Sequence, residues 1–160
     1  MIPYAHIFKA LSEAKVRYLV AGGIAVNLHQ VMRATVDLDL ILHLEKKNVL
    51  KFVESLQALG YVPRVPVAAA NLADPKKRRE WILEKNMMVF SFISPKNPLE
   101  IVDVFVKEPL PFDSLYKRRV EIKAFGVKIP VVGIEDLIKM KKKAGRERDI
   151  YDIKLLKKKP

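Results

Sequence analysis

The sequence predicts an α/β (α+β) fold, in which a small mixed β-sheet is flanked by helices and the chain ends in a helical segment. Short apolar runs alternate with amphipathic stretches of helical spacing over most of the chain. From about residue 133 onward, helical spacing dominates. We therefore expect one sheet with helices packed on it.

Composition limits the classes of protein to which the chain can belong. With 160 residues, 50% of them hydrophobic and 30% charged, we expect one domain, residues 1–160, with the sheet at about 17–131 and the helical segment at about 133–157. There is no cysteine, which excludes disulfides, thiolate metal sites and cysteine nucleophiles. The N-terminus lacks a signal-peptide pattern, and no apolar run reaches the roughly 18–20 residues of a membrane span. We expect a soluble cytoplasmic protein with no membrane partner.

Helical stripes and short apolar runs predict the elements of the first half. Ile7, Leu11 and Ala14 share one stripe of the first helix. Gly22-Gly23 breaks the first strand just before a short helix, where backbone amides can approach an anion, although such a turn is more often a simple turn. The expected order is helix 4–15, strand 17–21, helix 24–30, strand 36–43, helix 45–59 and strand 61–67.

Turn residues and strand patterns predict the elements of the second half. The sequence DPKKRRE, which starts at Asp74-Pro75, is expected to form a loop or a one-turn helix. Its four basic residues, Lys76 to Arg79, are better explained as solvated than as contacts to phosphate. Gly126 turns a hairpin, and the final helical segment is interrupted near Gly145. The expected order is strands 86–93 and 99–106, helix 112–118, hairpin strands 120–125 and 127–131, and helices 133–144 and 149–157.

Two carboxylates in one strand are the main chemical signal. Asp37 and Asp39 are two residues apart, so they share one face of the strand, with α-carbons roughly 6.6 Å apart. Carboxylates held together in an apolar strand repel each other and are costly to bury, and a divalent cation would remove both costs. Asp103 lies in the middle of a second apolar run, IVDVF, where packing does not explain an acid. Metal binding is therefore the first hypothesis.

Positive charge is concentrated at the C-terminal end. The formal net charge is +12, and residues 117–160 contain 15 Lys/Arg against 6 Asp/Glu. Such an end attracts polyanions, which include nucleoside triphosphates, RNA, DNA and acidic proteins. A lysine-rich solubilising surface is an equally good interpretation.

One lysine of the C-terminal helix is expected to point inward. Lys141 falls on the same stripe as Ile134, Leu137 and Ile138 by three- and four-residue spacing. A lysine among apolar neighbours needs a partner. A buried salt bridge to Asp149 or Glu135 would supply one.

Four segments together resemble a known family. LVAGGIAVNLH, RATVDLDLIL, IVDVF and GIEDLIKMKKKAGRERDIYDI are similar to the motifs of the nucleotidyltransferase superfamily related to DNA polymerase beta. The closer resemblance is to small single-domain nucleotidyltransferases of the AbiEii toxin type. Residues from about 62 to 84 match no motif of these proteins.

The resemblance implies roles for particular residues. It implies two magnesium ions, or manganese in their place, held by the three acids, with Asp103 also helping to deprotonate an attacking hydroxyl. Many members have a serine where this chain has Gly23, which leaves only a backbone donor to phosphate. Ordinary turn contacts explain Arg33 and Thr35 equally well. The implied sites are Asp37, Asp39 and Asp103 for metal and catalysis, and Gly22, Gly23, Arg33, Thr35 and Lys141 for the nucleotide.

The implied function is that of an enzyme of the EC 2.7.7 type. It would transfer a nucleoside monophosphate from a triphosphate to an acceptor and release pyrophosphate. The acceptor would be RNA, particularly a tRNA 3′ end, a protein hydroxyl or a small molecule. The alternative is a non-catalytic module of a toxin–antitoxin-like system that keeps the fold and binds nucleic acid or a partner protein.

The three histidines, His6, His29 and His43, show no ligand spacing and are expected to be structural.

Overall fold

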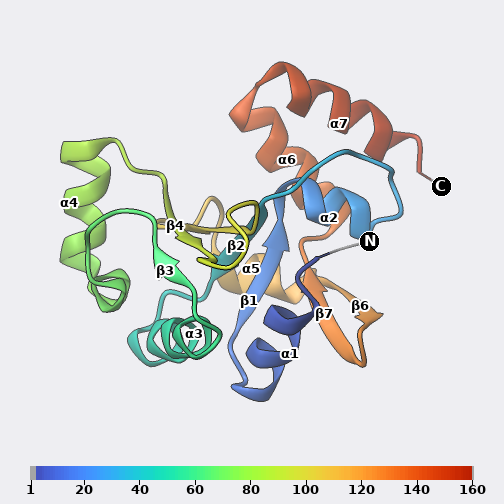
Figure 1. Ribbon diagram of the computed structural model, residues 1–160. Helices are drawn as coiled ribbons and strands as arrows, with labels where there is room; N and C mark the ends of the chain where they lie inside the picture. Colours follow the sequence, from blue (N-terminus) through green and yellow to red (C-terminus); the bar gives the residue numbers. More distant parts are fainter. Residues whose placement is uncertain (1–2, 160) are drawn as a thin grey trace.

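Seven strands form one mixed sheet in the order β3-β4-β5-β2-β1-β7-β6, in a computed structural model that describes residues 3–159 (Figure 1). The strands are β1 (Tyr18–Ala21), β2 (Leu38–Leu42), β3 (Val62–Pro63), β4 (Val89–Ile93), β5 (Ile101–Phe105), β6 (Val120–Ala124) and β7 (Val127–Val131). The helices are α1 (Ala5–Glu13), α2 (Gly22–Leu28), α3 (Lys46–Ala58), α4 (Pro75–Lys85), α5 (Phe112–Lys117), α6 (Ile134–Ala144) and α7 (Glu147–Lys157), with a 3₁₀ turn η1 (Ala69–Ala73). The predicted fold class is confirmed.

The middle of the sheet combines parallel and antiparallel pairs. β2 pairs with β1 in antiparallel fashion and with β5 in parallel. The β2–β5 register places Asp39 opposite Asp103, and the β1–β2 register places Ala21 opposite Asp39. The end of β1, the start of β2 and the middle of β5 therefore meet at one place in the sheet.

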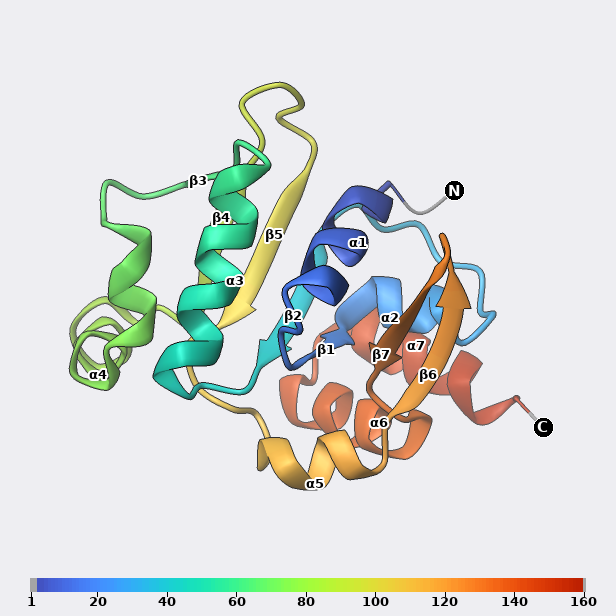
Figure 2. The ribbon, with the colours of Figure 1, turned by 90° about the horizontal axis from the view of Figure 1, so that it is seen from below.

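Helices lie on both faces of the sheet but cover it unevenly (Figures 1 and 2). α1 and α3 lie on one face, and α2, α6 and α7 lie on the other face beside β1 and β7. Every residue of β1 is buried, whereas β4 and β5 alternate between half-buried and buried residues. The half-buried face of β4 and β5 remains accessible, and it carries Asp103.

Helix α4 corrects the prediction of a loop or one-turn helix after Asp74. It is an eleven-residue helix with a capping residue at each end. The Asp74 side chain accepts a hydrogen bond from the backbone N–H of Lys76, Pro75 occupies the first turn, and Asn86 ends the helix in a left-handed conformation. These end signals outweigh the polar composition that suggested a loop.

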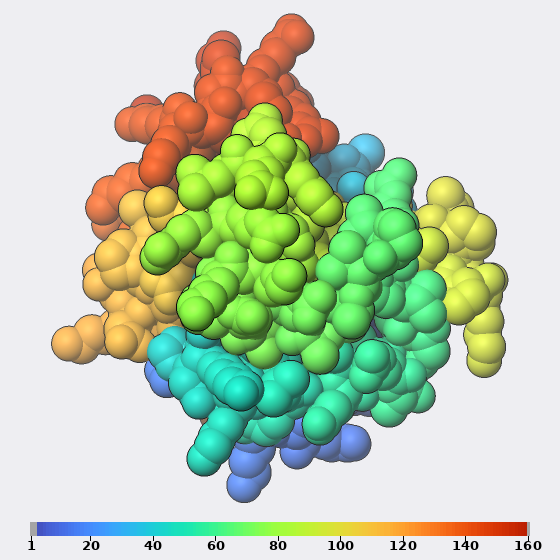
Figure 3. All heavy atoms as spheres, turned by 90° about the vertical axis from the view of Figure 1, so that its left-hand side faces the viewer, coloured from blue at the N-terminus to red at the C-terminus, as the bar shows by residue number. Residues whose placement is uncertain are grey.

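Two side chains anchor α4 against the rest of the molecule. Trp81 is buried and stacks on Phe90 of β4, with ring centroids 5.2 Å apart. Arg78 is also buried and donates a hydrogen bond of 2.6 Å to the carbonyl of Leu72. One of the four basic residues expected in solvent is therefore structural. Figure 3 shows α4 as a prominent ridge on this side of the molecule.

Several strands are shorter than predicted. β2 begins at Leu38, so Val36 and Asp37 precede it, both are exposed, and the prediction that Asp37 and Asp39 share one face of a strand is wrong. The strand predicted at 61–67 is reduced to two residues, Val62 and Pro63, because proline cannot donate to the ladder.

Among residues 3–159, no helix is long and apolar enough to cross a membrane.

Candidate active site

The two central strands bring Asp39 and Asp103 side by side. The residues are direct partners in the parallel β2–β5 register, and both are only partly buried among buried neighbours. Asp37 lies two residues before Asp39, in the exposed segment that leads into β2. This segment is tied to β5, because the Tyr4 hydroxyl donates to the Val36 carbonyl (2.6 Å) and accepts from the Ile101 N–H (3.2 Å).

Ser91 fixes one oxygen of Asp103. It is the partner of Asp103 in the antiparallel β4–β5 register, and its hydroxyl donates to Asp103 Oδ1 at 2.5 Å. Ser91 was not among the predicted site residues. The available signal was a lone hydroxyl inside the apolar strand VFSFI, on the face that alternation assigns to the acid.

Burial and mutual repulsion disfavour the ionised forms of Asp39 and Asp103. Burial, followed by the negative charges of Asp103 and Asp37, raises the pKa of Asp39 to about 6, and the charges of Lys141 and Arg146 offset only part of this rise. Burial also raises the pKa of Asp103, although the hydrogen bond from Ser91 lowers it. A bound cation would relieve both effects.

The donor set fits a hard divalent cation. Within residues 3–159, no three acid or histidine side chains converge closely enough to form a complete metal cage. No hydrogen bond or salt bridge of this part of the chain engages the carboxylate of Asp37 or Asp39. Magnesium commonly uses one or two carboxylates and takes its remaining ligands from phosphate and water. The neighbouring carboxylates of Asp39 and Asp103 meet that requirement.

The two glycines after β1 make room for functional side chains. Gly22 has a φ of +61°, and a Cβ there would overlap the Asp39 carboxylate. A Cβ on Gly23 would overlap Arg33 Nη1 and would lie 2.5 Å from Thr35 Oγ1. Arg33 and Thr35 therefore lie directly against the turn, an arrangement that fits both ordinary turn contacts and a position near the phosphates. Their contact with a nucleotide stays a prediction.

Replacing Gly23 with serine is expected to destabilise this chain. Arg33 and Thr35 occupy the space that the new side chain needs, so one of them must move. We expect a loss of about 1–3 kcal/mol in the free energy of unfolding, measured by urea denaturation. Ala34→Ser, at a neighbouring exposed position, is the control and should change stability by less than about 0.5 kcal/mol. Equal stability of the two variants would contradict the packing account.

A buried ion network lies behind the glycine turn. Asp152 of α7 is fully buried and accepts hydrogen bonds from Arg33 Nε at 2.8 Å and Lys141 Nζ at 2.9 Å. Lys141 also lies 3.8 Å from Asp149, whose other partner is Arg146, at 2.7 Å. Burial opposes ionisation of Asp149, but the hydrogen bonds and charge of Arg146 lower its pKa overall.

This network confirms that Lys141 points inward and shows it in a buried salt bridge, although no ion pair within residues 3–159 joins it to Glu135 and its nearest acid was not predicted. Asp149 is a neighbour of Lys141, as expected, but the closer partner is Asp152. Spacing was the signal that could have identified this acid, because Asp152 follows Asp149 by three residues and therefore lies on the same face of a helix. The network joins Arg33 and Lys141, two of the predicted nucleotide-binding residues, through one carboxylate.

A family model described as "Nucleotidyltransferase of unknown function (DUF6036)" matches residues 5–157. No curated protein matches the chain significantly.

Three solved structures are similar to the chain over most of their length. The lincosamide antibiotic adenylyltransferase LnuA, solved with lincomycin bound, is 18% identical with a TM-score of 0.62, over 96% of this chain and 93% of LnuA. ANT(2")-Ia, in complex with adenylyl-2"-tobramycin, is 13% identical with a TM-score of 0.60, over 94% and 83%. A putative nucleotidyltransferase from Thermotoga maritima, TM1012, is 15% identical with a TM-score of 0.58, over 92% and 86%.

Proposed function

The chain belongs to the nucleotidyltransferase family whose model matches residues 5–157, and we propose that it moves a nucleoside monophosphate from a nucleoside triphosphate to a hydroxyl acceptor with release of pyrophosphate. Asp39 and Asp103, in register on β2 and β5 beside the glycine turn, are the observation that carries this proposal. The adenylyltransferases LnuA and ANT(2")-Ia have the same fold and support ATP as the first donor to test.

Each residue of the site has a proposed role. Asp37, Asp39 and Asp103, together with phosphate and water, would hold divalent metal, magnesium or manganese, and the metal would supply positive charge to the phosphate oxygens. Gly22 and Gly23 let the backbone approach the triphosphate closely, and Arg33, Thr35 and Lys141 orient its phosphates. Asp152 holds Arg33 and Lys141 in place.

The reaction is a displacement at the α-phosphorus of the donor. The acceptor oxygen forms a bond to this phosphorus while the bond to the bridging oxygen of pyrophosphate breaks. The hydroxyl proton passes to the carboxylate of Asp103. Because Ser91 bonds Oδ1 of this carboxylate, Oδ2 is the oxygen proposed to face the hydroxyl.

RNA, a protein hydroxyl and a small alcohol are the candidate acceptors. The basic C-terminal end, residues 117–160, supports RNA, and the antibiotic acceptors of LnuA and ANT(2")-Ia support a small alcohol. A non-catalytic binding module is the rival function, and it would keep its ligands after the loss of Asp103.

Thermal denaturation with magnesium and each of the four ribonucleoside triphosphates tests the donor site. Only ligands that bind the folded state preferentially raise the melting temperature. We expect at least one triphosphate to raise it in the presence of magnesium, with little effect from either ligand alone. The shift should disappear in Asp39→Asn.

Transfer itself is measured with α-labelled triphosphate, magnesium and total RNA, protein or a panel of small alcohols. Label should reach one acceptor class, and Asp103→Asn should reduce the rate by at least about 100-fold. A triphosphate shift without transfer to any class would favour the non-catalytic module.

A further inference from the structure

The side of Asp103 away from the glycine turn is not used by the proposed donor site. The sheet order places β4 and β3 beyond β5, whereas the Gly22-Gly23 turn follows β1 on the opposite side of β2. In phosphoryl transfer the attacking and leaving oxygens lie roughly in line, on opposite sides of the phosphorus. The acceptor is therefore expected over β5, β4 and β3.

The surface at this place is apolar around a polar centre. The half-buried face has Ser91 and Asp103 in the middle, joined by their hydrogen bond. The residues around them on the same face are apolar: Val89, Ile93, Ile101 and Phe105. Such a surface suits the flat or apolar part of a ligand whose hydroxyl lies at Asp103.

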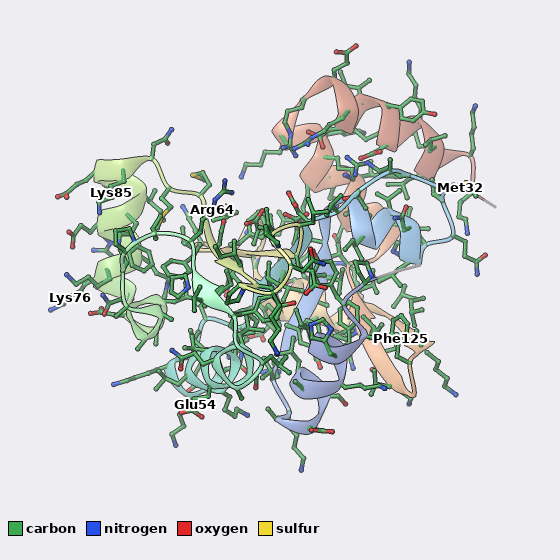
Figure 4. All side chains as sticks on the ribbon, viewed as in Figure 1. Met32, Glu54, Arg64, Lys76, Lys85 and Phe125 are labelled. Carbon is green, nitrogen blue, oxygen red and sulfur yellow. The ribbon has the colours of Figure 1, made fainter. Side chains whose placement is uncertain are left out.

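One arginine borders this surface. Arg64 directly follows β3, and its backbone N–H donates to the Ser91 carbonyl at 2.9 Å. Figure 4 shows its side chain extending away from the core, into the space between α4 and α6. The side chain is exposed, and no salt bridge among residues 3–159 engages its guanidinium. The backbone of Arg64 is joined to Asp103 through Ser91, whose hydroxyl donates to the Asp103 carboxylate.

We propose, on the basis of the function proposed above, that Arg64 binds a phosphate of the acceptor, and that the acceptor is therefore an alcohol that carries a phosphate near its reacting hydroxyl. A guanidinium binds phosphate through two parallel hydrogen bonds. The end of an RNA strand and a free nucleotide share this chemistry. An aminoglycoside, which carries several cationic amines, is disfavoured beside Arg64 on a protein with a net charge of +12.

A simpler role for Arg64 makes a different prediction. If its charge only favoured ionised Asp103, its loss would slow transfer to every acceptor equally and would not change the binding of any acceptor. A phosphate-binding role predicts a selective loss of binding for ligands that carry phosphate.

Fluorescence anisotropy of a short 5′-labelled RNA with a free 3′-hydroxyl separates these roles. Magnesium and a non-hydrolysable ATP analogue are present at saturation, so that the donor site is filled. The variants are Arg64→Glu and Lys123→Glu. Lys123 is an exposed, unpaired lysine on β6 at the opposite edge of the sheet, within the described residues, and its change alters net charge equally. Unlabelled AMP and adenosine are the competitors.

We expect Arg64→Glu to weaken RNA binding by about 10-fold or more and Lys123→Glu by less than about twofold. AMP should displace the RNA at a lower concentration than adenosine does. With α-labelled donor, transfer to AMP in preference to RNA would identify a free nucleotide as the acceptor, and the reverse an RNA end.

Three outcomes would overturn the proposal: equal losses in the two variants, equal competition by adenosine and AMP, or no binding of RNA and AMP by the wild-type protein. The melting-temperature shift with triphosphate is measured on the same samples. If that shift persists, only the Arg64 site is refuted, whereas its absence refutes the donor site itself.

Discussion

Asp39→Asn is expected to abolish nucleotidyl transfer and, in metal-free protein near neutral pH, to make the fold more stable. Burial and the charges of Asp103 and Asp37 raise the pKa of Asp39 to about 6. The folded protein therefore binds more protons at Asp39 than the unfolded chain does between about pH 4 and 6. The free energy of unfolding must then fall as the pH rises through this window. Asparagine removes the penalty together with the metal ligand.

The stability gain is expected to be about 3 kcal/mol at pH 7.5 and below about 1 kcal/mol at pH 4. It is measured by urea denaturation in the presence of a chelator at both pH values. Glu84→Gln, at an exposed position of α4, is the control and should show no such pH dependence. Magnesium with triphosphate should reverse the order of stability. A wild-type protein that is more stable than the variant at pH 7.5 without metal would contradict the electrostatic account.

Asp152→Asn is expected to give the largest loss of stability among the site variants. Asp152 is fully buried and is the common acceptor for Arg33 and Lys141. Its replacement leaves two largely buried cations around a neutral amide, and removal of one partner of a buried ion pair typically costs about 3–5 kcal/mol. We expect a loss in this range, together with loss of the melting-temperature shift produced by triphosphate and magnesium.

Asp136→Asn is the matched control for Asp152→Asn. Asp136 is equally buried, but its partner Arg118 is half-exposed and can be solvated after the change. We expect a smaller loss and an unchanged shift with triphosphate. If both variants lose the same stability and both keep the shift, Asp152 has no specific role at the donor site.

The sequence identified the candidate metal-site acids because strand alternation is a local rule. Asp39 and Asp103 stand out as acids in apolar strands, where side-chain direction depends only on position, whereas Asp37 lies in the exposed segment just before β2. The parallel pairing that makes Asp39 and Asp103 neighbours was not visible locally. It followed only from the resemblance to a family, and the register of β2 and β5 now supplies it.

Residues that act across the sheet or between helices were harder to predict. Ser91 contacts Asp103 on the neighbouring strand, and Arg64 contacts Ser91 in the same way. Asp152 contacts Arg33, which is 119 residues earlier in the chain. No spacing rule connects such distant positions. Helix α4 was missed for another reason, since its helical ends and its Trp81 anchor outweigh a composition typical of a loop.

The central claim is that Asp39 and Asp103 hold divalent metal beside a bound triphosphate. A crystal grown with manganese and a non-hydrolysable triphosphate tests it directly, because manganese scatters anomalously. We predict an anomalous peak about 2.0–2.3 Å from carboxylate oxygens of both residues, with the triphosphate against the Gly22-Gly23 turn. Triphosphate bound at the turn with no manganese on either carboxylate, or manganese bound elsewhere, would contradict the claim.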